Sequence, residues 1–400
     1  MNSVAADPAL PLTFSAALEL AERNAPQLTA EAAKIDATRS AAIPAGELPD
    51  PRLFFGIEGF PVSGPNAGTF DQDDFTMETI GVMQEVPNAG KRKARCQVAV
   101  AAIDVATADQ VVERSKVRQQ TAQAWLSRYY IERRIVVLSE LDKENTLLAE
   151  TVRAQLASGQ GMVTDAVMPR QEAAMLAGRR DELEQALAQA RASLRRWVGD
   201  AVDAPSAADL PPFVVEPQAL QQRLHRHPNL LRFVPLQSKA EAEVHEAQAS
   251  KRPDWGVEFA FQRRNPDFGN LVSLQFSFDL PLFTSRRQDP QIAAELAEVT
   301  QLHAERESML REHVAELESG IAEHARLVRA VARQHDTVMP LVREKVDLAL
   351  ASYSGGEGDL PAILAARREL IDARLREVDL QGERDAVAAR LLFTYGEEAE

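Results

Sequence analysis

Four histidines recur at nearly regular spacing in the second half of the chain, at His303, His313, His324 and His335. They lie in a segment dominated by Ala, Leu, Glu, Gln and Arg, a composition typical of long helices. Eleven residues make about three helical turns, so the imidazoles should line one stripe, with neighbours roughly 16 Å apart. That distance is too large for two of them to bind one ion within the helix. The pattern is consistent both with a stripe that binds metal ions or conducts cations and with an ordinary solvated helix face.

Motifs for catalysis or for cofactor binding do not emerge from the rest of the sequence. The Gly90-Lys91 pair lacks the preceding Gly and the following Ser or Thr that a phosphate-binding loop requires. Cys96 is the only cysteine, which excludes an intrachain disulfide and a cysteine metal cluster. We therefore expect a protein that is not an enzyme and that needs no cofactor.

Charge and composition narrow the class of protein further. The 400 residues carry a formal net charge of −15, which argues against a general nucleic-acid-binding protein. Aromatic residues make up only 6% and charged residues 26%, which favours extended helices over a large packed core. The sequence contains no run of eighteen apolar residues, so no transmembrane helix is expected.

The predicted elements occur twice in the same order, helix–strand–strand–long helix–helix. Residues 1–199 form a first structural repeat, with strands at about 52–60 and 75–86 and long helices at about 91–156 and 164–198. Residues 217–400 form a second repeat, with strands at about 254–262 and 271–280 and long helices at about 286–352 and 361–394. Residues 200–216, rich in Pro, Ala and Asp, form the linker between the repeats. The first long helix of each repeat would be on the order of 100 Å long.

The four predicted strands have one apolar and one polar face. In 271–280, for example, Val272, Leu274 and Phe276 alternate with Ser273 and Gln275. Such strands fit an ordinary sheet, and they also fit a transmembrane β-barrel. Four strands cannot close a barrel, because the smallest membrane barrels need about eight, and lipid does not tolerate an open edge. If these strands lie in a membrane, the chain must therefore oligomerise.

The order of these landmarks resembles that of TolC-type outer-membrane factors (outer-membrane efflux proteins) over essentially the whole chain. The matching pieces are the helix starts N-A-P-Q-L and H-P-N-L, the strand exits Q-E-V-P-N-A-G-K-R and D-L-P-L-F, and the Y-x-x-G turn at 353–356. The first exit, together with R-P-D-W-G-V-E-F and F-S-F-D-L-P-L-F, is most similar to the heavy-metal (Czc/Cus-type) branch.

This resemblance implies an α+β membrane protein, in which a trimeric twelve-stranded β-barrel in the outer membrane is continued by a long α-helical barrel in the periplasm. It implies a homotrimer that contacts outer-membrane lipid, a periplasmic adaptor (a membrane fusion protein) and an inner-membrane resistance–nodulation–division transporter, and no nucleic acid. The expected function is that of a passive exit duct for cations such as zinc, cobalt, cadmium or copper. Two alternatives stay open: the same fold exporting drugs or secreted protein, and a soluble coiled-coil scaffold with a small β-domain.

Two groups of residues receive a role in this arrangement. The expected barrel lumen is lined by Ser273, Gln275, Ser277 and Asp279. The expected periplasmic aperture is formed by the turns that contain Gly159, Gly161, Asp165, Gly355, Gly356, Glu357 and Asp359. Drug-exporting relatives often carry acidic residues just after the second turn, where this chain has Ala362 and Ala365, so their carboxylate gate is not transferred here.

Basic residues crowd the points where strands give way to long helices. The first turn of a helix prefers acids, because its exposed N–H groups carry partial positive charge. A cation cluster there is favourable at the periplasmic boundary of a membrane, where phospholipid headgroups are anionic. We therefore interpret these residues as a membrane-interface anchor, with a merely solvated basic turn as the alternative. They are Lys91, Arg92, Lys93 and Arg95 in the first repeat and Arg286 and Arg287 in the second.

Overall fold

The structure is a computed structural model that describes residues 11–70, 72–158, 163–207, 210–265, 267–355 and 357–396. The strands are β1 (Arg52–Glu58), β2 (Met77–Val86), β3 (Trp255–Arg263) and β4 (Leu271–Phe278). The α-helices of the first half are α1 (Phe14–Asn24), α2 (Pro26–Ala42), α3 (Ala89–Ala157) and α4 (Met168–Val198). Those of the second half are α5 (Pro217–Arg223), α6 (Pro228–Leu231), α7 (Phe233–Ala249), α8 (Gln288–Arg333), α9 (Met339–Ser354) and α10 (Leu360–Tyr395). Short 3-10 turns join them at Ile43–Gly46, Val163–Ala166, Gly199–Asp203, Leu224–Arg226 and Thr284–Arg286.

The two long helices differ in continuity. Helix α3 runs without a break for 69 residues. The second long helix, expected at 286–352, is instead divided by a π-helical turn at Gln334–Val338. Pro340, in the first turn of α9, explains the division. Proline lacks an N–H, and its ring clashes with the carbonyl group four residues earlier, so a regular α-helix cannot continue through it.

The described chain groups into two compact units, and each unit combines segments from both sequence repeats. Unit 1 contains residues 1–29, 111–227 and 310–400, and unit 2 contains residues 30–110 and 228–309. The spatial units therefore differ from the two sequence repeats.

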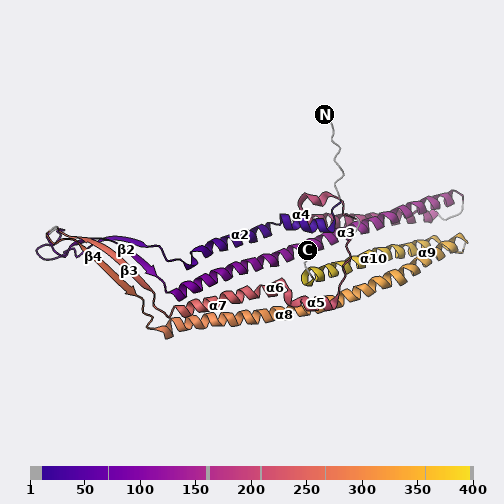
Figure 1. Cartoon of the computed structure of the whole chain (residues 1–400). Coiled ribbons are helices and arrows are strands. Elements are labelled where there is room, and N and C mark those ends of the chain that lie inside the picture. Colours follow the sequence, from indigo (N-terminus) through magenta and orange to yellow (C-terminus); the bar gives the residue numbers. More distant parts are fainter. Residues whose placement is uncertain are drawn as a thin grey trace, which may run out of the picture. The chain divides into compact units, whose positions relative to one another are not determined.

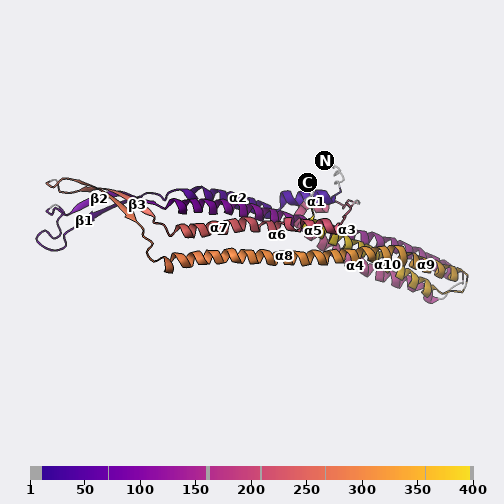
Figure 2. The same cartoon turned by 60° about the horizontal axis from the view of Figure 1, so that its bottom comes forward.

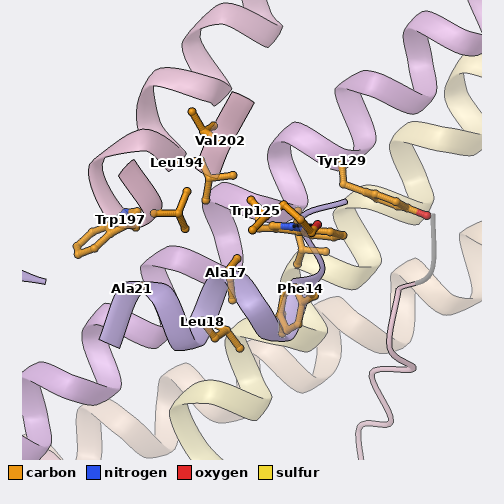
Figure 3. Close-up of a cluster of buried hydrophobic side chains, with 14 of the residues drawn as sticks. Phe14, Ala17, Leu18, Ala21, Trp125, Tyr129, Leu194, Trp197 and Val202 are labelled. Carbon is orange, nitrogen blue, oxygen red and sulfur yellow. Dashed lines mark hydrogen bonds between the residues drawn. The ribbon is translucent and has the colours of Figure 1, made fainter. Parts of the chain in front are cut away.

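The main core of unit 1 is built around Trp125 of α3, which is fully buried. Figure 3 shows this indole between α1 and the end of α4, with Phe14, Leu194 and Trp197 around it. The Phe14 ring meets the Trp125 ring edge-on at 5.4 Å between centroids. The Trp125 Nε1–H donates to the Leu12 carbonyl oxygen at 3.2 Å, which satisfies its only polar atom.

A buried arginine fastens the segment after α4 to this core. Arg128 is fully buried, and its guanidinium donates to the carbonyl oxygens of Val202 (2.9 Å) and Ala204 (2.6 Å). Its Nε–H donates to Glu132 at 2.8 Å, so the buried charge is paired within its own helix. The start of the inter-repeat linker is therefore held in place by hydrogen bonds to a buried side chain.

Elsewhere in unit 1, α9 and α10 pack side by side over much of their length (Figure 1). Their apolar contact is formed by Met339, Val342 and Val346 on the α9 side and by Ala366 and Leu370 on the α10 side. Further along α10, Leu391 packs over Gly320 of α8, where a Cβ atom would come within 2.8 Å of the leucine side chain.

Unit 2 contains one four-stranded antiparallel sheet in the order β1-β2-β3-β4 (Figures 1 and 2). The central pair joins the two repeats: β2 of the first pairs with β3 of the second, from Glu78 opposite Arg263 to Val86 opposite Trp255. The helical part of unit 2 is held by ion pairs that centre on Asp109 of α3. This carboxylate binds Lys34 of α2 at 2.7 Å and also Arg232, the residue before α7.

None of the helices in the described part of the chain is long and apolar enough to span a lipid bilayer.

Candidate functional site

The polar face of the sheet carries most of the residues expected in a lumen. Because directly paired residues of antiparallel strands share a face, the register shows which side chains lie together. Ser273, Gln275 and Ser277 lie on one face of β4, beside Glu258 of β3. Asp279 follows β4, and its backbone N–H donates to the Asp254 carbonyl oxygen at 2.9 Å. The pairs on this face are Ser273 with Ala260, Gln275 with Glu258, and Ser277 with Gly256.

The opposite face of the sheet is mostly apolar and exposed, although it includes Glu78 and Gln84 of β2. Phe55 is 84% exposed and Leu274 is 61% exposed, although both belong to regular strands. An exposed apolar surface of this extent marks a site that contacts another protein or a membrane. Its large exposed members are Leu53, Phe55, Ile57, Ile80, Val82, Trp255, Phe259, Phe261, Val272, Leu274, Phe276 and Phe278.

The outer strands of the sheet leave open edges. Within the described residues, β1 pairs only with β2, and β4 pairs only with β3. Each therefore presents a row of backbone N–H and C=O groups that can pair with another strand. An open sheet with one apolar face is incomplete in lipid, where every backbone polar group needs a partner.

One aromatic side chain departs from the alternation on the polar face. Phe54 of β1 lies opposite Gly81 of β2, and its ring packs over the glycine. A Cβ atom at position 81 would overlap the Phe54 ring and would lie 2.8 Å from the Phe259 carbonyl oxygen. Glycine is therefore required at position 81 for the backbones and the ring to approach this closely.

The passage from β2 into α3 is organised by Asn88. Its Oδ1 accepts the Lys91 backbone N–H at 2.9 Å, which caps the new helix. Its Nδ2 donates to the carbonyl oxygens of Ala249 (3.1 Å) and Arg252 (3.3 Å) and to Asp254 Oδ1 (2.9 Å). The Asn88 backbone N–H also donates to Asp254 Oδ1, at 2.7 Å. One amide side chain thus ties the strand exit of the first repeat to the strand entrance of the second.

Asp254 balances part of the basic cluster at this junction. The Lys91 ammonium donates to Asp254 Oδ2 at 3.1 Å, and both side chains are largely covered. Burial disfavours the charged carboxylate, but the hydrogen bonds from Asn88 and the charge of Lys91 outweigh it. The pKa of Asp254 is consequently lower than its ordinary value.

The remaining cations of the expected membrane anchor divide into paired and exposed groups. Arg95 binds Glu246 of α7, with Nε 2.8 Å from Oε1. Lys93, Arg286 and Arg287 are exposed. Arg92 is partly covered, and its Nε atom is buried without a hydrogen-bond partner in the described structure. Lys91 and Arg95 therefore have a structural role within the chain, whereas the exposed cations are available to an external anion.

The two expected aperture turns are described in part. Gly159, Gly161 and Gly356 lie outside the described residues. Asp165 lies in the 3-10 turn Val163–Ala166 before α4. In the second turn, Asp359 caps α10 by accepting the Ala362 backbone N–H at 3.1 Å.

The second turn is closed by backbone hydrogen bonds. The N–H groups of Glu357 (3.0 Å) and Gly358 (3.1 Å) both donate to the Ser352 carbonyl oxygen, and the Gly355 N–H donates to Ala351 at 3.0 Å. A Cβ atom at Gly358 would lie 2.9 Å from the Tyr353 backbone nitrogen, so this position is suited to glycine. The Glu357 side chain is exposed.

The four histidines of the expected stripe do not share one environment. His303 is exposed and shares a hydrogen bond with Gln237 at 3.1 Å. His324 is partly buried, and burial together with Arg384 lowers its pKa. His335 lies in the π-helical turn and bonds to Glu377 of α10 at 2.8 Å. His313 is buried, so neither a solvated face nor a free row of imidazoles describes the whole set.

Two side-chain clusters were missed in the sequence because their members lie far apart in the chain. His227, in the H-P-N-L motif, is buried against His313, with ring centroids 4.0 Å apart. Carboxylate oxygens of Glu243, Glu295 and Glu298 lie within 4.8 Å of one another between α7 and α8. The H-P-N-L motif and the i,i+3 spacing of the two α8 glutamates were visible, but their partners come from other helices.

Comparison with known proteins gives this arrangement a class. Residues 219–397 match the family "Outer membrane efflux protein". The chain is also similar to the outer membrane protein VceC of Vibrio cholerae, with a TM-score of 0.79, 17% identity, and coverage of 97% of each chain. The family match lies in the second half of the chain, and the likeness in fold extends over nearly all of it, so the chain resembles outer membrane efflux proteins in both respects.

Two further similarities concern the heavy-metal branch. The chain is 23% identical over 380 residues to the cobalt-zinc-cadmium resistance protein CzcC of Cupriavidus metallidurans, covering 93% of this chain and 87% of CzcC. Its fold matches that of CusC with a TM-score of 0.79 and 16% identity, over 99% of this chain and 95% of CusC. These similarities support the expected relation to the Czc/Cus branch.

Proposed function

We propose that three copies of the chain close a twelve-stranded barrel in the outer membrane and form a passive exit duct. The observation that supports this most directly is the sheet itself, which has an exposed apolar face and two open edges. Pairing β4 of one copy with β1 of the next satisfies both edges, and lipid covers the apolar face. Three copies supply enough strands to close, whereas one does not.

Ser273, Gln275, Ser277 and Asp279 then face the lumen, where polar side chains remain hydrated. In this arrangement the long helices extend into the periplasm, and the turns around Asp165 and Asp359 form the aperture. The exposed Lys93, Arg286 and Arg287 contact the anionic headgroups at the inner boundary of the membrane, while Lys91 and Arg95 hold the junction together.

A duct of this kind moves cargo only with a partner that supplies energy. We assign that role to an inner-membrane resistance–nodulation–division transporter, connected through a periplasmic adaptor. Transition-metal cations, with zinc, cobalt, cadmium and copper as the candidates, are the proposed cargo. The similarity to a protein named for cobalt, zinc and cadmium resistance supports this choice over drugs or secreted protein.

The barrel is tested by labelling neighbouring residues on opposite faces of β4. In a Cys96→Ser background, which removes the only native cysteine, Gln275→Cys should react with a water-soluble maleimide. Leu274→Cys is the matched control, and in membranes it should react only with a lipid-soluble reagent. Equal reaction of both positions with the water-soluble reagent, or a monodisperse monomer without detergent, would show that the barrel proposal is wrong.

The cargo is tested by the metal tolerance of a strain that lacks the gene. Reintroducing the full chain should restore growth in zinc, cobalt, cadmium or copper, whereas a chain without residues 271–278 should not, because its barrel cannot close. Unchanged metal sensitivity beside altered drug sensitivity would overturn the metal assignment and leave the duct itself intact.

A further inference from the structure

A pair of imidazoles is buried where the segment 217–227 meets α8 and α10 in unit 1. His227 and His313 are only 7% and 6% exposed, and their rings lie 4.0 Å apart between centroids at an interplanar angle of 41°. The Tyr395 ring completes the group, 5.5 Å from His227 and 5.9 Å from His313. Burial of an imidazole against a second imidazole disfavours a positive charge on it.

The hydrogen bonds of Tyr395 define the tautomer of His313. The Tyr395 hydroxyl donates to Glu316 Oε2 (3.3 Å) or to the His313 carbonyl oxygen (3.4 Å). Its oxygen must then accept from His313 Nδ1, 3.2 Å away, so Nδ1 carries the proton. His313 Nε2 is left with a bare lone pair, buried without a partner in the described structure. A proton added there would be a buried charged N–H with no acceptor.

The imidazole pair adjoins an apolar contact that holds the same segment. Leu220 and Leu224 are buried in one cluster with Leu317 and Leu391, from α8 and α10. This contact consists of a few leucines on seven-residue α5 and its following turn. The free energy from burying these leucines is therefore small, and a charge introduced beside the contact can offset it.

The charged groups around the imidazole pair are at least partly exposed to solvent. The Glu316 carboxylate is 3.5 Å from His313 Nδ1, and its side chain is 58% exposed. Glu312 of α8 and Arg390 of α10 act on Tyr395 at longer range, and Arg390 is paired with Glu323 at 2.8 Å. On the segment itself, His225 and Arg226 are exposed and Arg223 is partly covered. Glu316 contacts the Nδ1 side of the His313 ring from a solvated position.

We propose that the His227–His313 pair is an acid-sensitive latch, which holds segment 217–227 against α8 and α10 when His227 is neutral and releases it when His227 takes up a proton. Release exposes the leucines of the segment. This consequence rests on the function proposed above: in a duct whose helices lie in the periplasm, the latch would respond to the pH of that compartment.

The direction of the effect follows from the His227 imidazole. Burial, and secondarily the neighbouring His313, lower the pKa of His227 from 6.5 to about 4. The released form therefore binds the proton first, so latch stability is complete above about pH 6.5 and is lost as pH falls toward 4. At pH 5 the linkage raises the open population by at most about 30-fold, and we expect about tenfold because the site is partly screened by solvent.

Hydrogen exchange of the full-length protein in detergent tests the latch directly. Peptides covering 217–227 should exchange about tenfold faster at pH 5 than at pH 7.5, after correction for the intrinsic pH dependence of exchange. Peptides around Phe14 in the Trp125 core serve as the internal reference and should not change. Equal protection of 217–227 at both pH values in the wild-type protein would overturn the proposal, whatever the variants do.

Matched variants identify the titrating groups. His227→Gln should abolish most of the acid response, whereas His225→Gln, on an exposed histidine two residues away, should retain it. An acid response that persists in the His227→Gln/His313→Gln double variant would overturn the assignment. Specific stabilisation of the wild type by added Zn²⁺ at pH 7.5, lost in His227→Gln, would also overturn it, because the pair would then be a metal site.

Discussion

Replacing Asn88 by alanine should loosen the point at which β2 passes into α3. The side chain caps the helix through Lys91 and bonds to the carbonyl oxygens of Ala249 and Arg252 and to Asp254. A lost N-cap costs about 1 kcal/mol, and each lost hydrogen bond costs about 0.5–1.5 kcal/mol. Because the junction is only partly buried, we expect about 2–3 kcal/mol in total, near the lower end of that sum.

Hydrogen exchange of peptides covering 86–95 measures this cost locally. An opening free energy lower by about 2–3 kcal/mol corresponds to exchange faster by roughly 30- to 150-fold. Asn88→Ser keeps a capping oxygen but loses the two amide donors, and it should recover about 1 kcal/mol. Lys93→Ala, an exposed residue in the same turn, is the control and should stay within about 0.5 kcal/mol of wild type. The reasoning is refuted if Asn88→Ala changes exchange less than threefold, or if Lys93→Ala changes it equally.

Three other substitutions test contacts in the sheet and in unit 1, each by the thermal unfolding of the purified protein. Gly81→Ala should destabilise by about 1–3 kcal/mol, because its Cβ overlaps the Phe54 ring; adding Phe54→Ala should restore part of this, and no recovery would contradict the contact. Arg368→Ala leaves the buried Glu172 carboxylate without its 2.6 Å partner and should cost about 2 kcal/mol after allowance for the exposure of Arg368; Glu172→Gln in the same chain should recover at least half. Tyr130→Phe removes a buried hydroxyl that donates to Asp385 and should cost about 1–2 kcal/mol. Since burial and Asp385 raise the pKa of Tyr130 well above its ordinary value, that loss should be the same at pH 6 and pH 9.

The alternation of apolar and polar residues was enough to predict strands and their faces. Val272, Leu274 and Phe276 lie on one face and Ser273 and Gln275 on the other, because side chains of a strand point alternately to its two sides. What alternation could not provide was pairing across the repeats. That β2 lies beside β3 depends on contacts between residues more than 160 positions apart, such as Asn88 with Asp254.

The long helices were predicted because their composition is uniform and their apolar residues recur regularly. Local interruptions of these helices were not predicted. Pro340 was overlooked within the second long helix, and the π-helical turn before it follows from proline chemistry that the sequence already contained. The histidine stripe was expected on one helix, but only His303, His313 and His324 lie in α8, and His335 lies in the π-helical turn after it. The surroundings of the stripe depend on α10 and on segment 217–227. Burial of His313 beside His227 therefore could not be inferred from spacing alone.

The basic cluster between β2 and α3 also had partners that the sequence could not reveal. Four cations within five residues suggested one common role, as an anchor at the membrane. In the structure, Lys91 and Arg95 have acidic partners on the second repeat, while Lys93 remains exposed. Their partners, Asp254 and Glu246, lie more than 150 residues further along the chain.

The mixing of the two halves within each compact unit has a consequence for folding. Unit 1 takes residues 111–227 mainly from the first half of the chain and residues 310–400 from the second, and unit 2 is mixed in the same way. Neither half of the chain contains a complete unit, so each half needs the other to fold. Because both halves belong to one chain, contacts such as that between Asn88 and Asp254 form at a much higher effective concentration than two separate chains would give.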